Sequence, residues 1–200
     1  ALTSVWRNAG FTPIIGNPNF AYGEGKCLGG STFVNGGLIW RTPNKILEQW
    51  NNSQEIEGYD FHSLNNHFKK IEKKLNVVIE NNQDGLNKDS ELIHNLANKK
   101  KIKSVYVPRA IKNCKRHNNC ASGCSSGAKQ SVLQGYIYEA SFNGLKILTG
   151  SKVIKINFKK NGKDIAHSVL VWKEKENKFF EVFFKRIFLA CGPIQTPKLI

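Results

Sequence analysis

The stretch GKCLGGSTFVNGGLIWRTP, residues 25–43, holds residue types suited to binding a charged ligand against the backbone. Gly29 and Gly30 stand directly before Ser31, where we expect a helix to begin. The first amides of a helix lack an internal partner and carry the positive end of its dipole. Glycines there let a phosphate approach the backbone, and the Ser31 hydroxyl can cap the helix or bond a phosphate oxygen. The same residues also fit a glycine-rich turn that packs a helix against a strand.

One helical turn later, Asn35 falls on the same side of the expected helix as Ser31. Gly36 and Gly37 follow, and they remove side chains where a flat ring system could lie against the backbone. The segment therefore indicates a ligand that combines a phosphate group with a planar ring, with the packing turn as the alternative.

Three of the five cysteines form a second group that could do chemistry, in the stretch NCKRHNNCASGCSSGAKQ. Cys114, Cys120 and Cys124 have the spacing C-x5-C-x3-C, and thiolates favour soft metals and iron–sulfur clusters. A tetrahedral zinc site would add His117 to the three cysteines. The third interpretation is a loop with free thiols. An odd number of cysteines in a chain of 200 residues does not indicate a disulfide framework.

The composition is that of a basic chain with enough apolar residues for a packed core. Lysine and arginine number 30 against 15 acidic residues, the net charge is +15, and 40% of the residues are hydrophobic. The lysines are spread along the chain, which favours a solvated lysine surface over a nucleic-acid site. No apolar run approaches the roughly 20 residues that cross a bilayer. No signal or transit peptide is visible, but Ala1 is not Met, so we expect a fragment.

The periodicity of apolar residues predicts mainly helices up to residue 140. After irregular chain over 1–26, we expect a glycine-interrupted helix over 29–40 and a short helix capped by Asn44 and ending near Trp50. The next helix is expected to be capped by Ser63, with Leu64, Phe68, Ile71 and Leu75 on one face. The remaining expected elements are an amphipathic stretch at 92–97, an extended segment at 105–108, the cysteine loop at 113–127 and a helix at 128–140.

After Gly144 the pattern changes to that of strands. A short strand is expected at 146–148, and an antiparallel meander over 154–158, 168–172 and 179–184, with a turn at Asn161-Gly162. Residues 187–191 are all apolar, which is typical of a strand buried on both faces. Gly192-Pro193 ends this strand, and a helix is expected to start near Thr196-Pro197. The sequence therefore predicts a mixed α/β fold.

Three stretches, in this order, resemble the glucose-methanol-choline (GMC) family of flavin oxidoreductases. LGGSTFVNGG is similar to the family's Gly-Gly-Ser-(Ser/Thr)-x-x-Asn-Gly segment, which holds FAD. Residues 127–156 resemble the family's middle, a helix followed by strands, and ACGPIQTPKLI resembles its later turn with Thr-Pro. The resemblance implies part of a Rossmann-like FAD-binding domain with a β-meander, joined by helical lid or substrate-domain segments.

The resemblance carries flavin contacts onto named positions of this chain. Gly29, Gly30 and Ser31 would serve the diphosphate, while Asn35, Gly36, Gly37 and Leu38 would lie along the ribityl chain and the flavin ring, Leu38 through its backbone. Val153 would offer its backbone N–H and C=O to the adenine. The close approach of a strand and turn to the cofactor would come from Ala190, Cys191 and Gly192.

The same resemblance divides the chain into functional segments. These are a FAD-contacting loop and helix at 1–43, a helical lid or substrate-domain segment at 44–112, the cysteine loop at 113–127, and the helix, meander and buried strand of the FAD domain at 128–200. The family's first G-x-G-x-x-G turn is missing, and its catalytic histidine belongs beyond residue 200. The resemblance therefore implies an internal fragment with no catalytic residue of its own.

The implied activity is hydride removal from the CH–OH carbon of an alcohol, polyol or sugar to flavin N5. The cysteine loop resembles that of sugar dehydrogenases, which would place a three-iron four-sulfur cluster on Cys114, Cys120 and Cys124 and pass electrons to a haem or quinone partner. It also resembles that of long-chain alcohol oxidases, which have no established cluster. The implied location is the cytoplasm or the surface of the inner membrane. The alternative is a basic, zinc-stabilised nucleic-acid-binding module.

Overall fold

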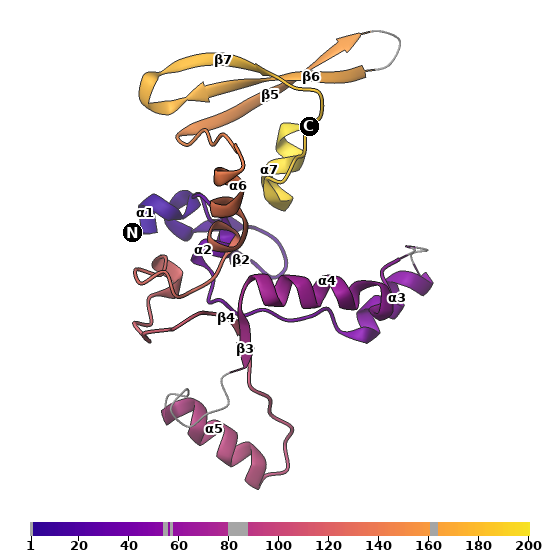
Figure 1. Cartoon of the computed structure of the whole chain (residues 1–200), viewed down its shortest axis with the longest axis vertical. Helices are drawn as coiled ribbons and strands as arrows, with labels where there is room; N and C mark the ends of the chain where they lie inside the picture. Colours follow the sequence, from indigo (N-terminus) through magenta and orange to yellow (C-terminus); the bar gives the residue numbers. More distant parts are fainter. Residues whose placement is uncertain (1, 54–55, 57, 80–87, 161–163) are drawn as a thin grey trace. The chain divides into compact units, whose positions relative to one another are not determined.

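Helices and strands are mixed along the chain in the computed structural model, which describes residues 2–53, 56, 58–79, 88–160 and 164–200 (Figure 1). The chain divides into two compact units, residues 1–145 and 146–200, and each is described by itself. The predicted mixed α/β class is confirmed. The boundary between the units falls inside the 128–200 segment of the sequence interpretation. Among the described residues, no helix is long and apolar enough to cross a membrane.

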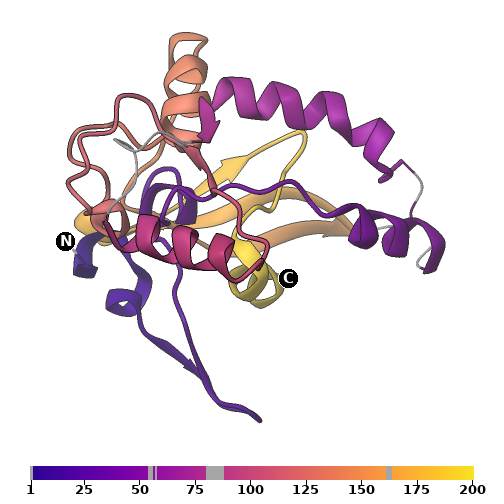
Figure 2. The same cartoon turned by 90° about the horizontal axis from the view of Figure 1, so that it is seen from below.

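The first unit begins with two short helical turns, α1 (Leu2–Val5) and η1 (Arg7–Gly10), and a hairpin of β1 (Thr12–Ile14) and β2 (Phe20–Tyr22). Thr12 pairs with Tyr22 in antiparallel register, and the hairpin projects away from the helices of its unit (Figure 2). The expectation of irregular chain over 1–26 was therefore wrong. Turn-forming residues connect the strands, and the Gly16 amide donates to Asn19 Oδ1 at 2.8 Å.

The expected helix over 29–40 is only one turn long, α2 (Ser31–Val34). The chain then extends, because Gly37 has a φ of +74° and the backbone bonds to another strand instead of to itself. Its partner is β4 (Pro108–Ala110): the Ala110 amide donates to Gly37 O at 2.8 Å and the Ile39 amide to Pro108 O at 3.0 Å. The glycines thus end the helix, and residues 37–39 pair with β4 as an edge strand would.

Three longer helices follow, α3 (Asn44–Ser53), α4 (Phe61–Lys74) and α5 (Lys88–Lys99). Asn44 is the first residue of α3 and not its cap, and the helix runs past Trp50. The cap of α4 is Asp60 and not Ser63, because Asp60 Oδ1 accepts the Ser63 amide at 2.9 Å. All three helices were predicted, α4 and α5 from their apolar faces and α3 from a cap at Asn44, whereas the caps expected for α3 and α4 were wrong.

The end of the glycine segment is tied to α4 by Arg41. Its guanidinium donates to both carboxylate oxygens of Glu72, each at 2.6 Å, and to Asn65 Oδ1 at 3.0 Å. The Arg41 hydrogen bonds hold the pKa of Glu72 below its usual value. This ion pair fixes where the chain that leaves the glycine segment enters the helical region.

We expect Glu72→Gln to lower the free energy of unfolding by about 0.5–1 kcal/mol at neutral pH, a modest value because both partners are about a third exposed. A depressed carboxyl pKa contributes stability above the unfolded pKa of roughly 4.3 and loses it as the pH falls through the folded pKa. Urea unfolding across this range should show the difference between the proteins shrinking in acid. Glu48→Gln, an exposed change on α3, serves as the control. A constant difference would contradict the assignment.

The strand β3 (Val77–Ile79) pairs with β4, Val77 opposite Ala110, and brings the end of α4 beside the chain that leads to the cysteine loop. Buried apolar residues of this unit are Val34, Leu47, Leu75, Ala110, Ile111 and Ala128. The helix expected over 128–140 starts later, as a π turn η4 (Leu133–Ile137) continued by α6 (Tyr138–Phe142). Lys129 instead forms an isolated antiparallel β-bridge with Ile111. Because of this pairing, residues 128–131 are not part of the helix.

The second unit is built on the antiparallel meander β5 (Ser151–Lys160), β6 (Asp164–Lys173) and β7 (Lys178–Phe183), as Figure 1 shows. This prediction is confirmed, while the expected turn at Asn161-Gly162 lies outside the described residues. The core of the unit is formed by Ile156, Val169 and Val171. Residues 146–148, expected to be a strand, form none.

Residues 187–191 do not form the buried strand that their sequence predicts. No strand of the described residues pairs with them, and Phe188 is 89% exposed while Ile187 and Leu189 pack on the meander core. The helix α7 (Gly192–Leu199) begins at Gly192, with Pro193 in its first turn, and not near Thr196. An apolar run needs neighbouring strands on both sides to become a central strand, and the described residues supply none here.

Candidate cofactor site at the glycine segment

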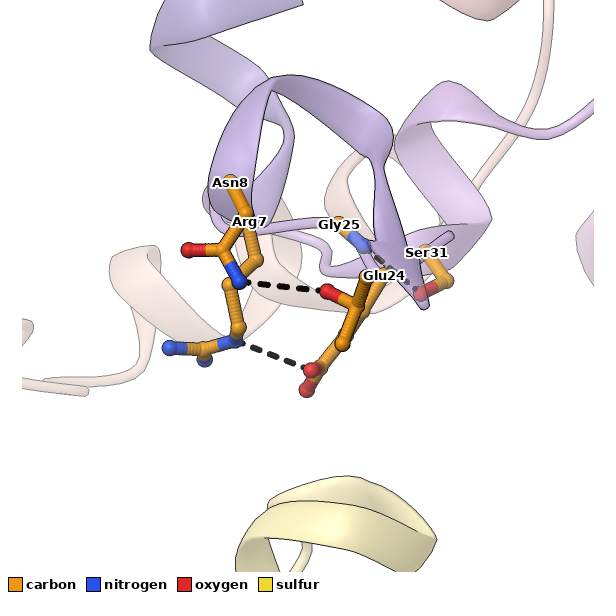
Figure 3. A network of polar contacts seen from close by, with 6 residues as sticks. Arg7, Asn8, Glu24, Gly25 and Ser31 are labelled. Carbon is orange, nitrogen blue, oxygen red and sulfur yellow. Dashed lines mark hydrogen bonds and ion pairs between the residues drawn. The ribbon is translucent and has the colours of Figure 1, made fainter. Parts of the chain in front are cut away.

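The start of the glycine segment is anchored to the N-terminal residues (Figure 3). The Arg7 amide donates to Glu24 O at 2.8 Å, and Arg7 Nε pairs with Glu24 Oε2 at 2.9 Å. The next amide, of Gly25, donates to Ser31 Oγ at 3.0 Å, which folds the segment back on the first turn of α2. Ser31 Oγ therefore braces the loop as an acceptor and keeps its hydroxyl hydrogen for another partner.

The glycines before α2 differ in what surrounds them. A Cβ at Gly25 would lie 2.7 Å from the backbone carbon of Gly30 and from the Ser31 nitrogen, so a side chain has no room there. Gly29 and Gly30 have φ values of +88° and +55°, which L side chains rarely adopt. A Cβ at Gly30 would meet no heavy atom of the described residues within 4 Å. The loop is thus tightly closed at Gly25 and faces open space at Gly30.

The residues after α2 form the second half of the segment. Asn35 Oδ1 accepts the amide of Gly37 at 3.0 Å, which closes a tight turn. Gly37 is buried, and a Cβ there would lie 3.3 Å from Lys129 Cγ, so its lack of a side chain serves packing. Gly36 is exposed and Leu38 is 56% exposed, in a bridge with Arg109. Of the expected ring contacts, Gly36 and Leu38 are accessible and Gly37 is covered.

A buried lysine holds this segment in place, and sequence reasoning missed it. Lys129 is only 2% exposed. Its Nζ donates to the carbonyl oxygens of Phe33, Asn35 (2.6 Å) and Cys120 (3.0 Å), which uses all three donors of an ammonium group. One side chain thereby joins the end of α2, the turn after it and the cysteine loop. Nothing in its spacing separates Lys129 from the rest of the lysines and arginines, which number 30 in all.

Burial lowers the pKa of Lys129, because water is replaced by protein around the charged group. The negative charge that Cys120, Cys124 and Cys27 carry as thiolates acts in the opposite direction and favours the ammonium form. The site therefore combines an ammonium group, three carbonyl acceptors and three thiols in one small volume. This electrostatic arrangement couples the glycine segment to the cysteine loop.

The cysteine loop also packs directly on α2. Gly123 has a φ of +83°, and a Cβ there would lie 2.7 Å from Cε1 of Phe33. Trp6 Nε1 donates to Ala121 O at 2.8 Å, which attaches the loop to the N-terminal residues. The loop is therefore part of the wall around the glycine segment and is held from two sides.

The structure gives no support to the metal interpretations of the cysteine loop. Cys114, Cys120 and Cys124 are half-buried free cysteines. Within the part of the chain that the structure describes, no group of three or more His, Cys, Asp and Glu side chains comes together to hold a metal ion. The iron–sulfur cluster is therefore not carried forward, and neither is the zinc site with His117.

The remaining predicted contacts lie in the second unit. Val153 is 38% exposed in β5, opposite Val171 and next to a register shift. Cys191 is exposed and caps α7, whose first residue, Gly192, has a φ of +84°. Ala190 is exposed on the chain leading into that helix, and α7 contacts β5. The structure thus brings Val153 and the 190–192 turn into one unit, and the glycine segment into the other.

A cavity of about 730 Å³ opens beside the accessible end of the glycine segment. Gly36 and Leu38 form one side of it, and α5, the extended chain of 104–107 and the cysteine loop form the others. This volume lies within the roughly 300–1,000 Å³ of typical small-molecule sites. The accessible edge of the segment therefore faces a space large enough for a small organic ligand.

The family profile described as GMC oxidoreductase matches residues 2–200. The chain belongs to the GMC oxidoreductase family. An uncharacterised GMC-type oxidoreductase of Sinorhizobium fredii is 28% identical over 200 residues, which cover 100% of this chain and 39% of that protein. One from Mycobacterium tuberculosis is 24% identical over 196 residues, 98% of this chain and 30% of that protein. A long-chain-alcohol oxidase of Arabidopsis thaliana is 23% identical over 194 residues, 90% of this chain and 25% of that protein.

The GMC chain spans well under half the length of these relatives. Its family resemblance was predicted from the sequence and is confirmed. GMC oxidoreductases are flavin enzymes, so the family identifies an oxidoreductase domain that binds FAD.

Two cysteines of the GMC chain differ in their predicted reactivity. Burial raises the pKa of Cys27. Burial also raises that of Cys124, but hydrogen bonds from the Ser126 hydroxyl and from backbone amides, including Lys129 N at 3.4 Å, lower its pKa overall. Because the thiolate is the reacting form, we expect iodoacetamide to label Cys124 several-fold faster than Cys27 at about pH 7.5. Peptide mapping by mass spectrometry measures both rates. Equal rates in the native protein, as expected only after unfolding, would contradict the prediction.

Proposed function

We propose that the glycine segment holds the diphosphate of FAD in an enzyme that oxidises CH–OH groups. The observation that carries the proposal is the open space that an added Cβ would find at Gly30, next to Ser31. The loop before Gly30 is held closed by the contact of Gly25 with the backbone of Gly30 and Ser31 and by the hydrogen bond from the Gly25 amide to Ser31 Oγ. A backbone without side chains, braced by its own hydrogen bonds, is the kind of surface on which a diphosphate lies close to amide groups. The GMC family of the chain favours FAD as that ligand.

Each predicted residue has a defined part in this proposal. Gly29, Gly30 and Ser31 would face the diphosphate, and the Ser31 hydroxyl hydrogen is free to donate to it because its oxygen already accepts from Gly25. Asn35, Gly36 and Leu38 would lie along the ribityl chain and ring, with Gly37 packed behind them against Lys129. The second unit would contribute Val153 to the adenine and the turn formed by Ala190, Cys191 and Gly192.

FAD would supply the hydride-accepting ring, and the residues of this chain would bind and orient it. The buried ammonium of Lys129 fixes the carbonyls of Phe33 and Asn35, and so fixes the backbone on both sides of the proposed ring contacts. The proton on the substrate hydroxyl would be taken by a base outside this chain. The role proposed here is therefore cofactor placement.

Alcohols are the proposed substrate class, with polyols and sugars as members of the same CH–OH chemistry. The name of the Arabidopsis relative, a long-chain-alcohol oxidase, supports an alcohol. The haem or quinone partner depended on the iron–sulfur cluster, and we do not propose it without that cluster. The nucleic-acid-binding alternative has lost its zinc site within the described residues and is not carried forward.

The test uses the full-length protein, purified gently and without added flavin. We expect a yellow protein that releases FAD on denaturation, identified by mass spectrometry, and whose flavin absorbance bleaches without oxygen when an alcohol is added. A colourless protein that takes up no added FAD would overturn the cofactor assignment. A flavoprotein that no alcohol, polyol or sugar reduces would overturn the substrate class alone.

A further inference from the structure

The helix α5 leaves its large apolar side chains exposed among the described residues. These are Leu92, Ile93 and Leu96, which are 60%, 66% and 49% exposed. The half-buried residues of the helix are Glu91, His94 and Ala97, which recur every three positions and so share another side of it. This side is attached to the following chain, because His94 Nδ1 lies 2.7 Å from the Ser104 hydroxyl. An amphipathic helix ordinarily buries its apolar side, and α5 does the reverse.

The preceding helix, α4, is also rich in lysine but covers most of its apolar side. Leu64 and Phe68 are half-buried, and Leu75, directly after the helix, is buried. Of this side only Ile71 is exposed, at 40%. The exposed lysines of α4 include Lys69, Lys70 and Lys73. The two helices therefore share their basic charge and differ in how much apolar surface accompanies it.

Four exposed lysines stand at the end of α5, where the apolar side chains are exposed. They are Lys99, Lys100, Lys101 and Lys103. The Lys101 amide donates to Asn98 O at 3.1 Å and the Ile102 amide to Ala97 O at 2.9 Å, which are the two hydrogen bonds of a Schellman motif. This motif keeps Ile102, which is 63% exposed, beside the last turn of the helix. Basic charge and aliphatic side chains are thus gathered at one end of α5.

The α5 surface, as we name it, consists of Leu92, Ile93, Leu96 and Ile102 together with Lys99, Lys100, Lys101 and Lys103. The acidic residues Asp89 and Glu91 lie in the first turn of the helix, and residues 96–105 contain none. A second copy of this chain does not fit the surface, because both copies would carry these lysines and a net charge of +15. A nucleic acid would use the lysines but leave the aliphatic side chains in water. Anionic headgroups above acyl chains match both parts.

We propose that the α5 surface docks on a membrane that carries anionic lipids. The lysines would lie among the headgroups, and the four aliphatic side chains would enter the boundary between headgroups and acyl chains. Ile93 also lines the cavity beside the glycine segment, so that cavity would lie next to the lipid. The inference depends on the charge and exposure of this surface and not on the proposed cofactor.

Docking is measured by flotation of the full-length protein with lipid vesicles. Vesicles of mixed phosphatidylcholine and phosphatidylserine should bind about tenfold more tightly than phosphatidylcholine alone, and added salt should weaken the binding. The measurement needs neither flavin nor alcohol, so a protein that docks but holds no FAD would refute the proposed function and leave this inference standing. A protein that shows no preference for the anionic vesicles would overturn the inference.

Variants of three lysines locate the charged part of the surface. The test variant combines Lys99→Gln, Lys100→Gln and Lys103→Gln. The control makes the same change on α4, with Lys69→Gln, Lys70→Gln and Lys73→Gln. The test variant should bind the mixed vesicles about a hundredfold more weakly, at about fivefold for each charge, and the control less than about threefold. Equal losses would mean general attraction of a basic protein and would overturn the proposal.

Lys101→Gly removes a charge of the surface at a position where glycine suits the fold. Lys101 has a φ of +56°, which glycine adopts more readily than lysine, so the variant should be at least as stable as the unchanged protein. It should still bind the mixed vesicles about fivefold more weakly. Because the fold is retained, unchanged binding would count directly against docking through this surface.

Leu92→Gln tests the apolar part and keeps a good helix former in α5. The variant should bind the mixed vesicles about fivefold more weakly, and this ratio should persist when salt is raised, because burial of apolar groups is not screened. Ile15→Gln is the control, since Ile15 is 89% exposed in the connection between β1 and β2, and it should bind as the unchanged protein does. If the two variants bound equally well, adsorption would depend on charge alone and the proposed docking would be wrong.

Discussion

Replacing Lys129 by methionine should lower the free energy of unfolding by about 3 kcal/mol, the value expected when a buried charged donor is removed and its acceptors remain. Methionine has a similar length and fills the volume against Gly37, so the loss reports hydrogen bonding more than packing. The carbonyls of Phe33, Asn35 and Cys120 would each lose a donor. The measurement is urea unfolding followed by tryptophan fluorescence.

The same variant should bind FAD more weakly even where it is fully folded. Phe33 and Asn35 lie on either side of the end of α2, and their carbonyls are held by one ammonium group. Without it, the turn to Gly36 is free to move relative to the cysteine loop. The FAD content of the variant, measured well below its unfolding temperature, separates this effect from loss of the fold.

Lys70→Met is the matched control for this prediction. Lys70 is exposed on α4, so the same chemical change there should alter stability by no more than about 0.5 kcal/mol and leave the FAD content unchanged. If the Lys129→Met and Lys70→Met proteins had equal free energies of unfolding, the hydrogen bonds of Lys129 would not stabilise the fold as predicted here. A Lys129→Met protein that is less stable but keeps all of its FAD would restrict its role to folding.

The parts that could be predicted from the sequence are those whose information is local. The meander was predicted from the alternation of polar and apolar residues at 154–158 in β5 and from the two largely apolar stretches that follow in β6 and β7. The helix α4 was predicted because Leu64 and Phe68 repeat at helical spacing. The glycine segment was singled out as a candidate cofactor-binding loop from its glycines, serine and asparagine, and its part in binding stays a prediction. Periodicity and composition carry all of these signals.

The parts that could not be predicted depend on contacts between distant residues. Lys129 lies more than 90 residues from the carbonyls of Phe33 and Asn35, and no local pattern marks it. The helix expected over 29–40 stops after one turn because β4 offers its backbone to Gly37 and Ile39. The run at 187–191 has the composition of a central strand but no paired neighbour among the described residues. Pairing partners of this kind are supplied by tertiary structure.

Gly25→Ala should produce the second large effect, a loss of about 2–3 kcal/mol of stability together with most of the bound FAD. The added Cβ would lie 2.7 Å from the backbone carbon of Gly30 and 2.7 Å from the nitrogen of Ser31. Backbone atoms cannot rotate away as a side chain can, so the loop must open. The hydrogen bond between the Gly25 amide and Ser31 Oγ would lengthen at the same time.

The comparison with Gly16→Ala decides whether the effect comes from the clash or from the loss of a glycine as such. At Gly16 the nearest heavy atom to an added Cβ is Pro18 O, at an ordinary 3.8 Å, so the change should be neutral within about 0.5 kcal/mol. Unfolding curves and FAD content are measured for both variants. Because the proposed diphosphate surface at Gly29 and Gly30 exists only while the Gly25 turn is closed, an alanine at Gly25 that retains full FAD would contradict the proposed cofactor site.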